Sequence, residues 1–354
     1  MVSRSSDGGE TWSEPTGLIV DTDPNVGDDK ESITADPRNS RFVYAVWDRL
    51  DFTAFPIITG PIWFARTANG GASWEPARII FDPGPNASTV SNQIVVLRDG
   101  TLVNLFDLFN QNGAFLAVIR STDRGITWSQ PIIVNTLESI GIVDVKTGEP
   151  VRAGDIPNIA VNRNDGTLYV VWEDARFSGL LRDGIVFSKS TDSGLTWSSP
   201  VQVNQAPKVQ AFTPSIAIGR NGALAITYYD FRKDTPDPAT LLTNYWRITS
   251  HDGGNSWREI PLAGPFDMRT APVAIGGFFV GDYEGLVRAQ ESFTPFFVLA
   301  NTGNILNRTD VFVISAEEKG DTSTDGHEEN NSHPKSLRER MLSHRETRPP
   351  GMHR

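Results

Sequence analysis

Cysteine is absent from the 354-residue sequence, and histidine is scarce. Without cysteine there can be no disulfide, thiolate zinc site, iron–sulfur cluster or cysteine nucleophile. Of the five histidines, His251 alone precedes residue 316. Chemistry that relies on a histidine base is therefore disfavoured, and we predict neither a metal site nor a cofactor.

A net positive charge and long apolar runs are also missing. The formal net charge is −11, whereas a nucleic-acid binder needs a basic stripe to neutralise phosphates. No apolar run approaches the roughly 20 residues that span a bilayer, and residues 1–12 lack the apolar segment of a signal peptide. We expect no nucleic-acid partner, no membrane span and a monomer. We also expect the full-length form to be secreted or on the cell surface, its signal peptide absent from this chain, with a cytoplasmic location as the open alternative.

Glycine, proline and tryptophan are plentiful, at 31, 23 and 9 residues, and helical periodicity is hard to find. Short strands joined by tight turns have this composition. The sequence therefore predicts an all-β fold.

One motif, Ser/Thr-x-Asp-x-Gly-x-Thr/Ser-Trp, occurs five times. The copies span residues 5–12, 67–74, 121–128, 190–197 and 250–257, with Asp7, Asn69, Asp123, Asp192 and Asp252 at the acidic position. An Asp or Asn side chain accepts bonds from nearby backbone N–H groups, and glycine supplies a positive φ. We therefore predict that these Asp boxes are structural turns.

A second repeat lies between the boxes, where two apolar runs are joined by a short polar turn. It covers residues 31–48, 91–107, 156–174, 213–230 and 283–301. Turns such as Arg98-Asp99-Gly100 are hairpin signals. The repeating unit is therefore a hairpin, a third strand, a box and a fourth strand, which predicts a β-propeller of four-stranded antiparallel blades.

The five boxes with their tryptophans and blade-length spacing resemble the sialidase (neuraminidase) superfamily, and in particular bacterial BNR-repeat proteins of the exo-α-sialidase-like kind. The resemblance covers residues 1–316 and implies six blades. Because the first box has no hairpin before it, the first blade is expected to be incomplete, and five blades closed by the N-terminal strand are the alternative. Residues 317–354 are polar and are expected to form a disordered tail.

Strand direction separates two faces of such a propeller. The boxes and hairpin turns share one face, so a ligand site is expected on the other, where second strands end and first strands begin. Second strands end in Trp47-Asp48-Arg49, Trp172-Glu173-Asp174-Ala175-Arg176 and Tyr229-Asp230-Phe231-Arg232. Because arginine forks bind carboxylates, we predict that Arg49, Arg176 and Arg232, with Asp230 and Glu284, bind an anionic sugar. The alternative is a local Asp–Arg ion pair repeated by duplication.

The resemblance also implies a tyrosine nucleophile assisted by a glutamate, and an aspartate acid/base. Tyr283 is the candidate nucleophile, Glu31 or Glu173 its partner, and Asp29 the acid/base. The Phe/Tyr-Arg-Ile-Pro motif that carries the first arginine of sialidases is absent from this sequence.

Two further features bear on the site. Residues 134–155 form the longest insertion between blades and are a candidate lid. Trp63 and Trp246 are expected either to pack between blades or to stack on sugars.

Three functions compete. The first is a sialidase-like exo-glycosidase acting on a sialoside. The second is a non-catalytic propeller that binds a glycan or a protein. The third, a polysaccharide lyase, needs a His or Tyr base, and His251 lies in a box on the wrong face for it.

Overall fold

The computed structural model describes residues 1–20, 22–55, 57–153, 156–289 and 292–314. In this part of the chain the regular elements are β-strands and two short 3-10 turns, η1 (Arg176–Ser178) and η2 (Met268–Thr270), which agrees with the predicted all-β class. No helix in it is long and apolar enough to cross a membrane. The predicted tail, residues 317–354, lies outside the described residues.

The chain forms two compact units, each of which is described by itself. Unit 1 comprises Met1–Leu137, Ile159–Val170 and Ser188–Pro200. Unit 2 comprises Glu138–Asn158, Val171–Phe187 and the described residues from Val201 onward.

Unit 1 contains two four-stranded antiparallel sheets with the strands in chain order. The first has β1 (Val26–Ala35), β2 (Val43–Asp51), β3 (Ile62–Thr67) and β4 (Arg78–Phe81); the second has β5 (Ser88–Val96), β6 (Leu102–Asn110), β7 (Gly113–Ser121) and β8 (Ile132–Thr136). A further four-stranded sheet has residues in both units: β11 (Asn158–Val161), β12 (Leu168–Asp174), β13 (Gly184–Ser190) and β14 (Val201–Gln202).

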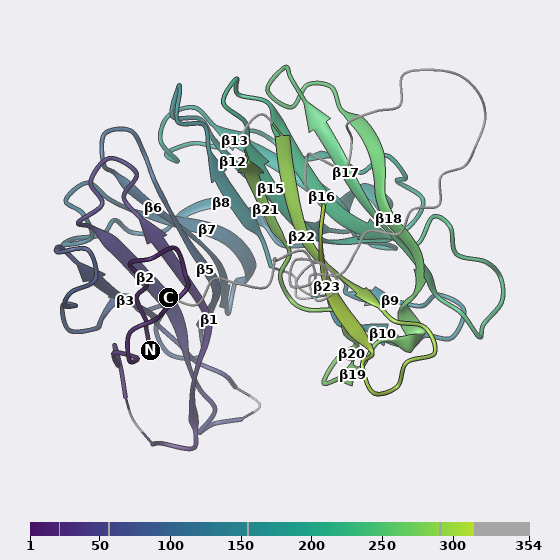
Figure 1. The fold of residues 1–354 in the computed structure, drawn as a ribbon, viewed down its shortest axis with the longest axis horizontal. Coiled ribbons are helices and arrows are strands. Elements are labelled where there is room, and N and C mark those ends of the chain that lie inside the picture. The colour runs from purple at the N-terminus through teal and green to yellow at the C-terminus, as the bar shows by residue number, and fades with distance from the viewer. Residues whose placement is uncertain (21, 56, 154–155, 290–291, 315–354) are drawn as a thin grey trace, which may run out of the picture. The chain divides into compact units, whose positions relative to one another are not determined.

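Unit 2 contains three more sheets (Figure 1). One is antiparallel, with β15 (Ala211–Ile218), β16 (Leu224–Asp230), β17 (Leu242–Ser250) and β18 (Arg258–Asp267); another has three strands, β21 (Gly285–Ala289), β22 (Ser292–Ala300) and β23 (Thr309–Val313). The last is small and mixed, in the order β19 (Val273–Ala274), β20 (Gly277–Phe278), β10 (Pro150–Val151) and β9 (Ile142–Val143).

The repeating unit is as the sequence predicts. In four sheets a hairpin is followed by a third strand, a box and a fourth strand, because the boxes fall between β3 and β4, β7 and β8, β13 and β14, and β17 and β18. The first box is flanked only by an isolated bridge between Val2 and Thr16. The sheet β21–β22–β23 has no box in its described residues.

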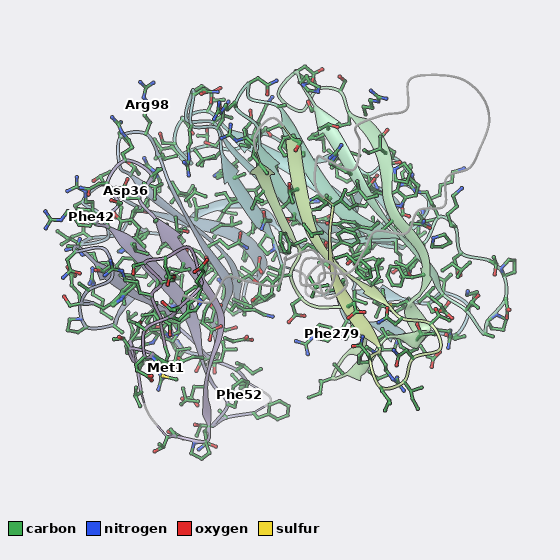
Figure 2. The ribbon with its side chains drawn as sticks, in the orientation of Figure 1. Met1, Asp36, Phe42, Phe52, Arg98 and Phe279 are labelled. Carbon is green, nitrogen blue, oxygen red and sulfur yellow. The ribbon has the colours of Figure 1, made fainter. Side chains whose placement is uncertain are left out.

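The hairpin turns lie at the same end of their sheet as the boxes. The Gly70 N–H in the second box donates to the Arg41 carbonyl in the β1–β2 turn. Figure 2 shows Asp36 and Arg98, from two hairpin turns, at one end of unit 1, and Phe52, directly after β2, at the other. The C-terminal ends of the second strands therefore lie at the opposite end of the sheet from the boxes, one strand length away.

The third box shows how the turn is held. The Asp123 carboxylate accepts bonds from the Thr127 N–H at 2.9 Å and from the Thr127 and Ser121 hydroxyls at 2.7 and 2.8 Å. These donors lower the pKa of Asp123 to about 2. Gly125 has φ +83°, and a Cβ there would lie 2.6 Å from the Phe64 ring. Phe64 packs edge-on against Trp128, with ring centres 5.6 Å apart, so the box also anchors one sheet on the next.

We expect Asp123→Ala to lower the free energy of unfolding by about 1–2 kcal/mol, because three turn donors lose their acceptor. The second box supplies a natural comparison: Asn69 accepts from the Ser73 N–H at 2.9 Å and donates to the Ser73 hydroxyl at 2.8 Å. Asp123→Asn should therefore cost clearly less than Asp123→Ala. Urea denaturation of both variants measures this, and equal losses would contradict it.

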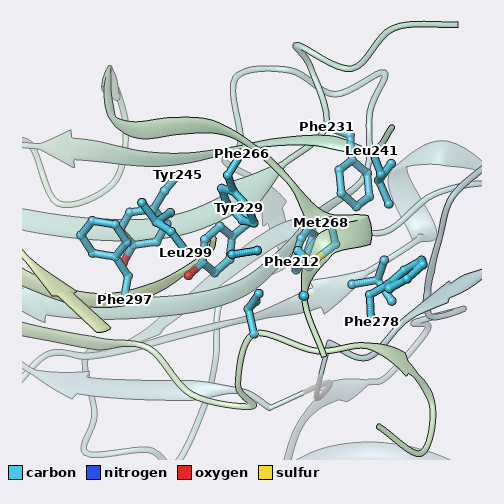
Figure 3. Close-up of a cluster of buried hydrophobic side chains, with 14 of the residues drawn as sticks. Phe212, Tyr229, Phe231, Leu241, Tyr245, Phe266, Met268, Phe278, Phe297 and Leu299 are labelled. Atoms are coloured by element: carbon cyan, nitrogen blue, oxygen red, sulfur yellow. The ribbon is translucent and has the colours of Figure 1, made fainter. Parts of the chain in front are cut away.

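Apolar side chains pack the sheets of each unit face to face. In unit 1, Tyr44, Ile62 and Phe64 of the first sheet meet Ile94 and Phe106 of the second. In unit 2 the main cluster joins the sheet of β15–β18 with the small mixed sheet and with β22 and β23, through residues that include Phe212, Tyr229, Tyr245, Met268, Phe278 and Phe297 (Figure 3).

The insertion proposed as a lid is held in place at many points. Its strand β10 pairs in parallel with β20, more than 120 residues away in the chain. The Gln210 side chain bonds both the N–H and the carbonyl of Val143, and the Asp183 carboxylate accepts from the Ile140 N–H. Within unit 2 the insertion is thus part of a sheet with several side-chain anchors.

Candidate functional site

A carboxylate near the end of a second strand holds the first strand of the next sheet. Asp48 on β2 is fully buried and accepts from the Ser91 N–H at 2.8 Å and from the Thr89 hydroxyl at 3.2 Å. Ser91 has φ +71° and lies in a bulge of β5. Burial raises the pKa of Asp48 to about 8.

The same arrangement occurs in unit 2. Glu173 on β12 is 2% exposed and accepts from the N–H of Thr213 at 2.7 Å. Thr213 has φ +50° and lies in the corresponding bulge of β15. Glu173 is a residue predicted to assist the nucleophile, and one of its oxygens accepts a hydrogen bond that joins two sheets.

The strand register changes how the end of β16 aligns with the end of β2, compared with the alignment drawn from the sequence pattern. Asp48 pairs with Asp29 just before the bulge of β1, and Tyr229 pairs with Phe212 just before the bulge of β15. Tyr229, and not Asp230, therefore occupies the position of Asp48. Its hydroxyl donates to the Val298 carbonyl at 2.6 Å and accepts from the Val298 N–H at 3.0 Å.

Between the sheet of β15–β18 and the sheet of β21–β23, the buried carboxyl group comes from the following sheet and not from the second strand. Glu284, directly before β21, faces the hydroxyls of Tyr229 and Tyr245. Burial raises the pKa of Glu284 to about 8 despite those hydroxyls and the Val298 N–H, which act in the opposite direction. Glu284 therefore holds a proton at neutral pH and is suited to hydrogen bonding with the tyrosines.

Two of the predicted sugar-binding arginines are paired with the aspartate two residues before them. Arg176 bonds Asp174 through two nitrogens at 2.7 and 2.6 Å, and Asp174 also accepts from the Trp172 indole at 2.9 Å. Arg232 bonds Asp230 at 2.6 Å, and Asp230 accepts from the Trp246 indole at 2.8 Å. This geometry is the local ion pair that was the alternative interpretation of the Asp-x-Arg pattern.

Arg232 has further partners that the sequence pattern did not indicate. Its guanidinium bonds both oxygens of Glu259 on β18 and lies 3.7 Å from the centre of the Trp246 ring. The hydroxyl of Tyr228 also bonds Glu259. Trp246 is 8% exposed and covered by Arg232, so it serves packing and not sugar stacking.

Arg49, in unit 1, is paired differently. Its guanidinium bonds Asp28 at 3.1 Å and lies over the Trp63 ring, which itself stacks on Trp47. Asp28 also accepts from the Trp47 indole at 3.1 Å, and its pKa is raised by burial and then by the nearby Glu31 carboxylate.

Asp29 and Glu31 follow on the same strand, and both are exposed. Asp29 accepts from the N–H of Lys30, the bulge residue of β1, at 2.9 Å. Glu31 lines a hollow of about 340 Å³ in unit 1 together with Asp28, Trp47 and apolar residues of the first 19 positions. This volume falls within the usual range for small-molecule sites.

Tyr283 is the one exposed tyrosine among six. Its exposed fraction is 53%, whereas Tyr44, Tyr169, Tyr228, Tyr229 and Tyr245 are exposed by 4% or less. Both neighbours are anchored: Asp282 forms two bonds with Arg152, at 3.1 and 2.9 Å, and Glu284 faces the two buried tyrosines. The chain therefore presents the Tyr283 ring to solvent.

Sequence reasoning missed Arg152, Glu259, Tyr229 and Tyr245 at these positions. Arg152 and Glu259 belong to no repeated pattern in the sequence, and only the fold brings them to Asp282 and Arg232. Among the described residues no group of three or more His, Asp and Glu side chains is placed to hold a metal ion.

These features define an all-β repeat protein with carboxylates and arginines at the ends of its second strands and one exposed tyrosine before a first strand. The chain belongs to the BNR repeat-like domain family, whose profile matches residues 61–275. The BNR resemblance drawn from the boxes is thus confirmed. A search of curated proteins finds no match.

Similar solved structures include a protein of unknown function from Dyadobacter fermentans, with 16% identity, a TM-score of 0.53 and coverage of 84% of this chain and 81% of that one. The α-L-arabinofuranosidase arb93a from Fusarium graminearum has 15% identity, a TM-score of 0.53 and coverages of 84% and 79%. The NanB sialidase from Streptococcus pneumoniae has 10% identity, a TM-score of 0.53 and coverages of 86% and 61%. At these identities the likeness shows a common fold. Two of these three structures are glycosidases.

Proposed function

We propose that the protein is a propeller glycosidase of the sialidase type, an exo-acting hydrolase of an anionic sugar such as a sialoside. The four box-bearing sheets, the sheet β21–β22–β23 and the segment with the first box would be its six blades, and its site would lie on the face opposite the boxes. The observation that supports this most is Tyr283, whose side chain is the one of six tyrosines that is not buried. The fold shared with the NanB sialidase and the arb93a arabinofuranosidase is consistent with it.

In this proposal Tyr283 attacks the anomeric carbon. A neutral phenol is a poor nucleophile, so a carboxylate must take its proton. Glu284 is protonated at neutral pH, because its pKa is raised to about 8 by burial, and is therefore a poor acceptor. Among the acidic residues of unit 2, Glu173 is therefore the preferred acceptor of the Tyr283 proton. Arg176 and Arg232 would bind the sugar carboxylate, in competition with Asp174 and Asp230.

That competition favours a second candidate, a glycosidase for a neutral sugar. Each of the three predicted arginines already bonds an aspartate of this chain, which leaves little net positive charge for an anion. The hollow of unit 1 offers Trp47 as an apolar wall and two carboxyl groups, Asp28 and Glu31. A pair of carboxyl groups is what acid–base hydrolysis of a glycosidic bond requires.

One experiment separates these proposals. The wild type, Tyr283→Phe and Glu31→Gln would be assayed with a fluorogenic sialoside and a fluorogenic α-L-arabinofuranoside. The sialidase proposal predicts sialoside turnover that falls at least about 100-fold in Tyr283→Phe, a loss typical of a removed catalytic group. The neutral-sugar proposal predicts arabinofuranoside turnover that depends on Glu31 and survives in Tyr283→Phe.

Tyr169→Phe is the matched control, because it removes a buried hydroxyl from the opposite end of the strand that carries Glu173. It should retain turnover in either case. A folded wild type that turns over neither substrate, yet binds glycans on an array, would instead identify a non-catalytic binding propeller.

A further inference from the structure

The ammonium group of Lys146 is enclosed by oxygen atoms. Its Nζ donates to the backbone carbonyls of Thr235, Asp237 and Thr240 at 3.1, 3.0 and 2.6 Å. It also lies 2.7 Å from Oδ2 of Asp234. The side chains of Lys146 and Asp234 are each 14% exposed, so water has little access to this group.

The loop between β16 and β17 is shaped for this arrangement. Thr235 and Asp237 each precede a proline, which restricts them to extended backbone and fixes the direction of their carbonyls. The other oxygen of Asp234 accepts from the Leu242 N–H at 2.9 Å, at the start of β17. Oδ1 of Asp237 accepts from the Ala239 N–H, also at 2.9 Å.

Lys146 reaches this loop from a separate anchored turn. Its own N–H donates to Asp144 at 3.0 Å in the connection between β9 and β10. Arg269 bonds both Asp144, at 2.9 Å, and Glu149, at 2.6 Å. The turn is thus fixed independently of the ammonium group.

We propose that residues 234–240 form a binding site for a monovalent cation, and that the Lys146 ammonium is its resident occupant. An ammonium has three donors and no acceptor, and here it has four oxygen partners. Three carbonyls and one carboxylate replace its water shell as carbonyl rings do for potassium ions. Calcium sites use six to eight oxygen ligands where four are present here, and one carboxylate provides too little charge for a divalent ion.

With the lysine removed, a free potassium or ammonium ion should bind among the same four oxygens, which are called the oxygen ring below. The lysine ties the long insertion to the loop that follows Arg232, and the free ion would restore only the shape of that loop. This inference is independent of the proposed glycosidase activity.

The test is the melting temperature of Lys146→Ala in potassium chloride, ammonium chloride and tetramethylammonium chloride at equal ionic strength. We expect a drop of about 3–8 °C in tetramethylammonium chloride, since that ion is too large for the oxygen ring, and a partial recovery in the other two salts. Lys208→Ala is the matched control, because Lys208 is an exposed lysine of the same unit. The wild type and this control should not distinguish the three salts.

Equal melting temperatures of Lys146→Ala in all three salts would overturn the proposal, as would equal recovery in Lys146→Met, whose side chain fills the oxygen ring with carbon. Should Lys146→Ala fail to fold in every salt, reductive methylation of the native wild type decides. Peptide mass spectrometry should show Lys146 modified far more slowly than Lys208. Equal modification would contradict an enclosed ammonium.

Discussion

Arg232→Ala is expected to lower the free energy of unfolding by about 3 kcal/mol, a large loss for a single change at the predicted site. Removing the guanidinium leaves Asp230, which is fully buried, and Glu259, which is 12% exposed at its side chain, without their shared cation. It also uncovers the face of Trp246. Urea denaturation followed by tryptophan fluorescence measures the loss.

The control is Arg49→Ala, which removes an arginine paired with Asp28, a carboxylate whose side chain is 32% exposed. That variant should lose about 1 kcal/mol or less. Adding Glu259→Gln to Arg232→Ala should recover part of the loss, because one uncompensated charge disappears. A loss no larger than that of Arg49→Ala would show that the network around Arg232 contributes little, and Arg232 could then be used directly to test sugar binding.

The free energy of unfolding is expected to fall as the pH rises from about 4 to about 8. The pKa values of Asp48 and Glu284 are raised to about 8 in the folded protein, from 3.8 and 4.5. Between these values the folded state holds protons that the unfolded state releases. The contribution is therefore fully present below pH 4 and is lost by pH 8, with a slope of at most about 1.4 kcal/mol per pH unit for each group.

Glu284→Gln should flatten this slope, because the amide keeps a hydrogen-bonding group beside Tyr229 and Tyr245 but does not titrate. Unfolding by urea at a series of pH values gives the slope. The control is Asp192→Asn in the fourth box, where the pKa is lowered to about 2 by the Thr196 hydroxyl and N–H. Asp192 stabilises the fold above pH 4 and loses this effect as the pH falls towards 2, so its variant should leave the slope from pH 4 to 8 unchanged. Parallel profiles of the wild type and Glu284→Gln would refute the assignment.

The box units could be predicted from the sequence because their structure depends on local chemistry. A carboxylate, a glycine and a tryptophan within eight residues define the turn, and the turn fixes which strands it joins. The predicted candidates Tyr283 and Arg232 also lie at strand ends as expected, with Tyr283 exposed.

The rest depends on bulges and on distant partners. The sequence pattern aligned Asp48 with Asp230 because each follows an aromatic residue, whereas pairing with the bulged first strand aligns Asp48 with Tyr229. Glu259 lies 27 residues beyond Arg232, with no pattern linking the two. The small mixed sheet has two-residue strands, too short for any periodicity to appear in the sequence.

The parallel pairing of β10 with β20 has a consequence for synthesis on the ribosome. Arg152, directly after β10, bonds Asp282, which is 130 residues later in the chain. At roughly 5–20 residues per second, the earlier segment waits on the order of 10 s for its partner to be made. During that interval β10 is paired only with β9, and its other edge lacks β20. Its apolar side chains are then available to chaperones, so slower translation of residues 152–278 should prolong its exposure and lower the yield of folded protein.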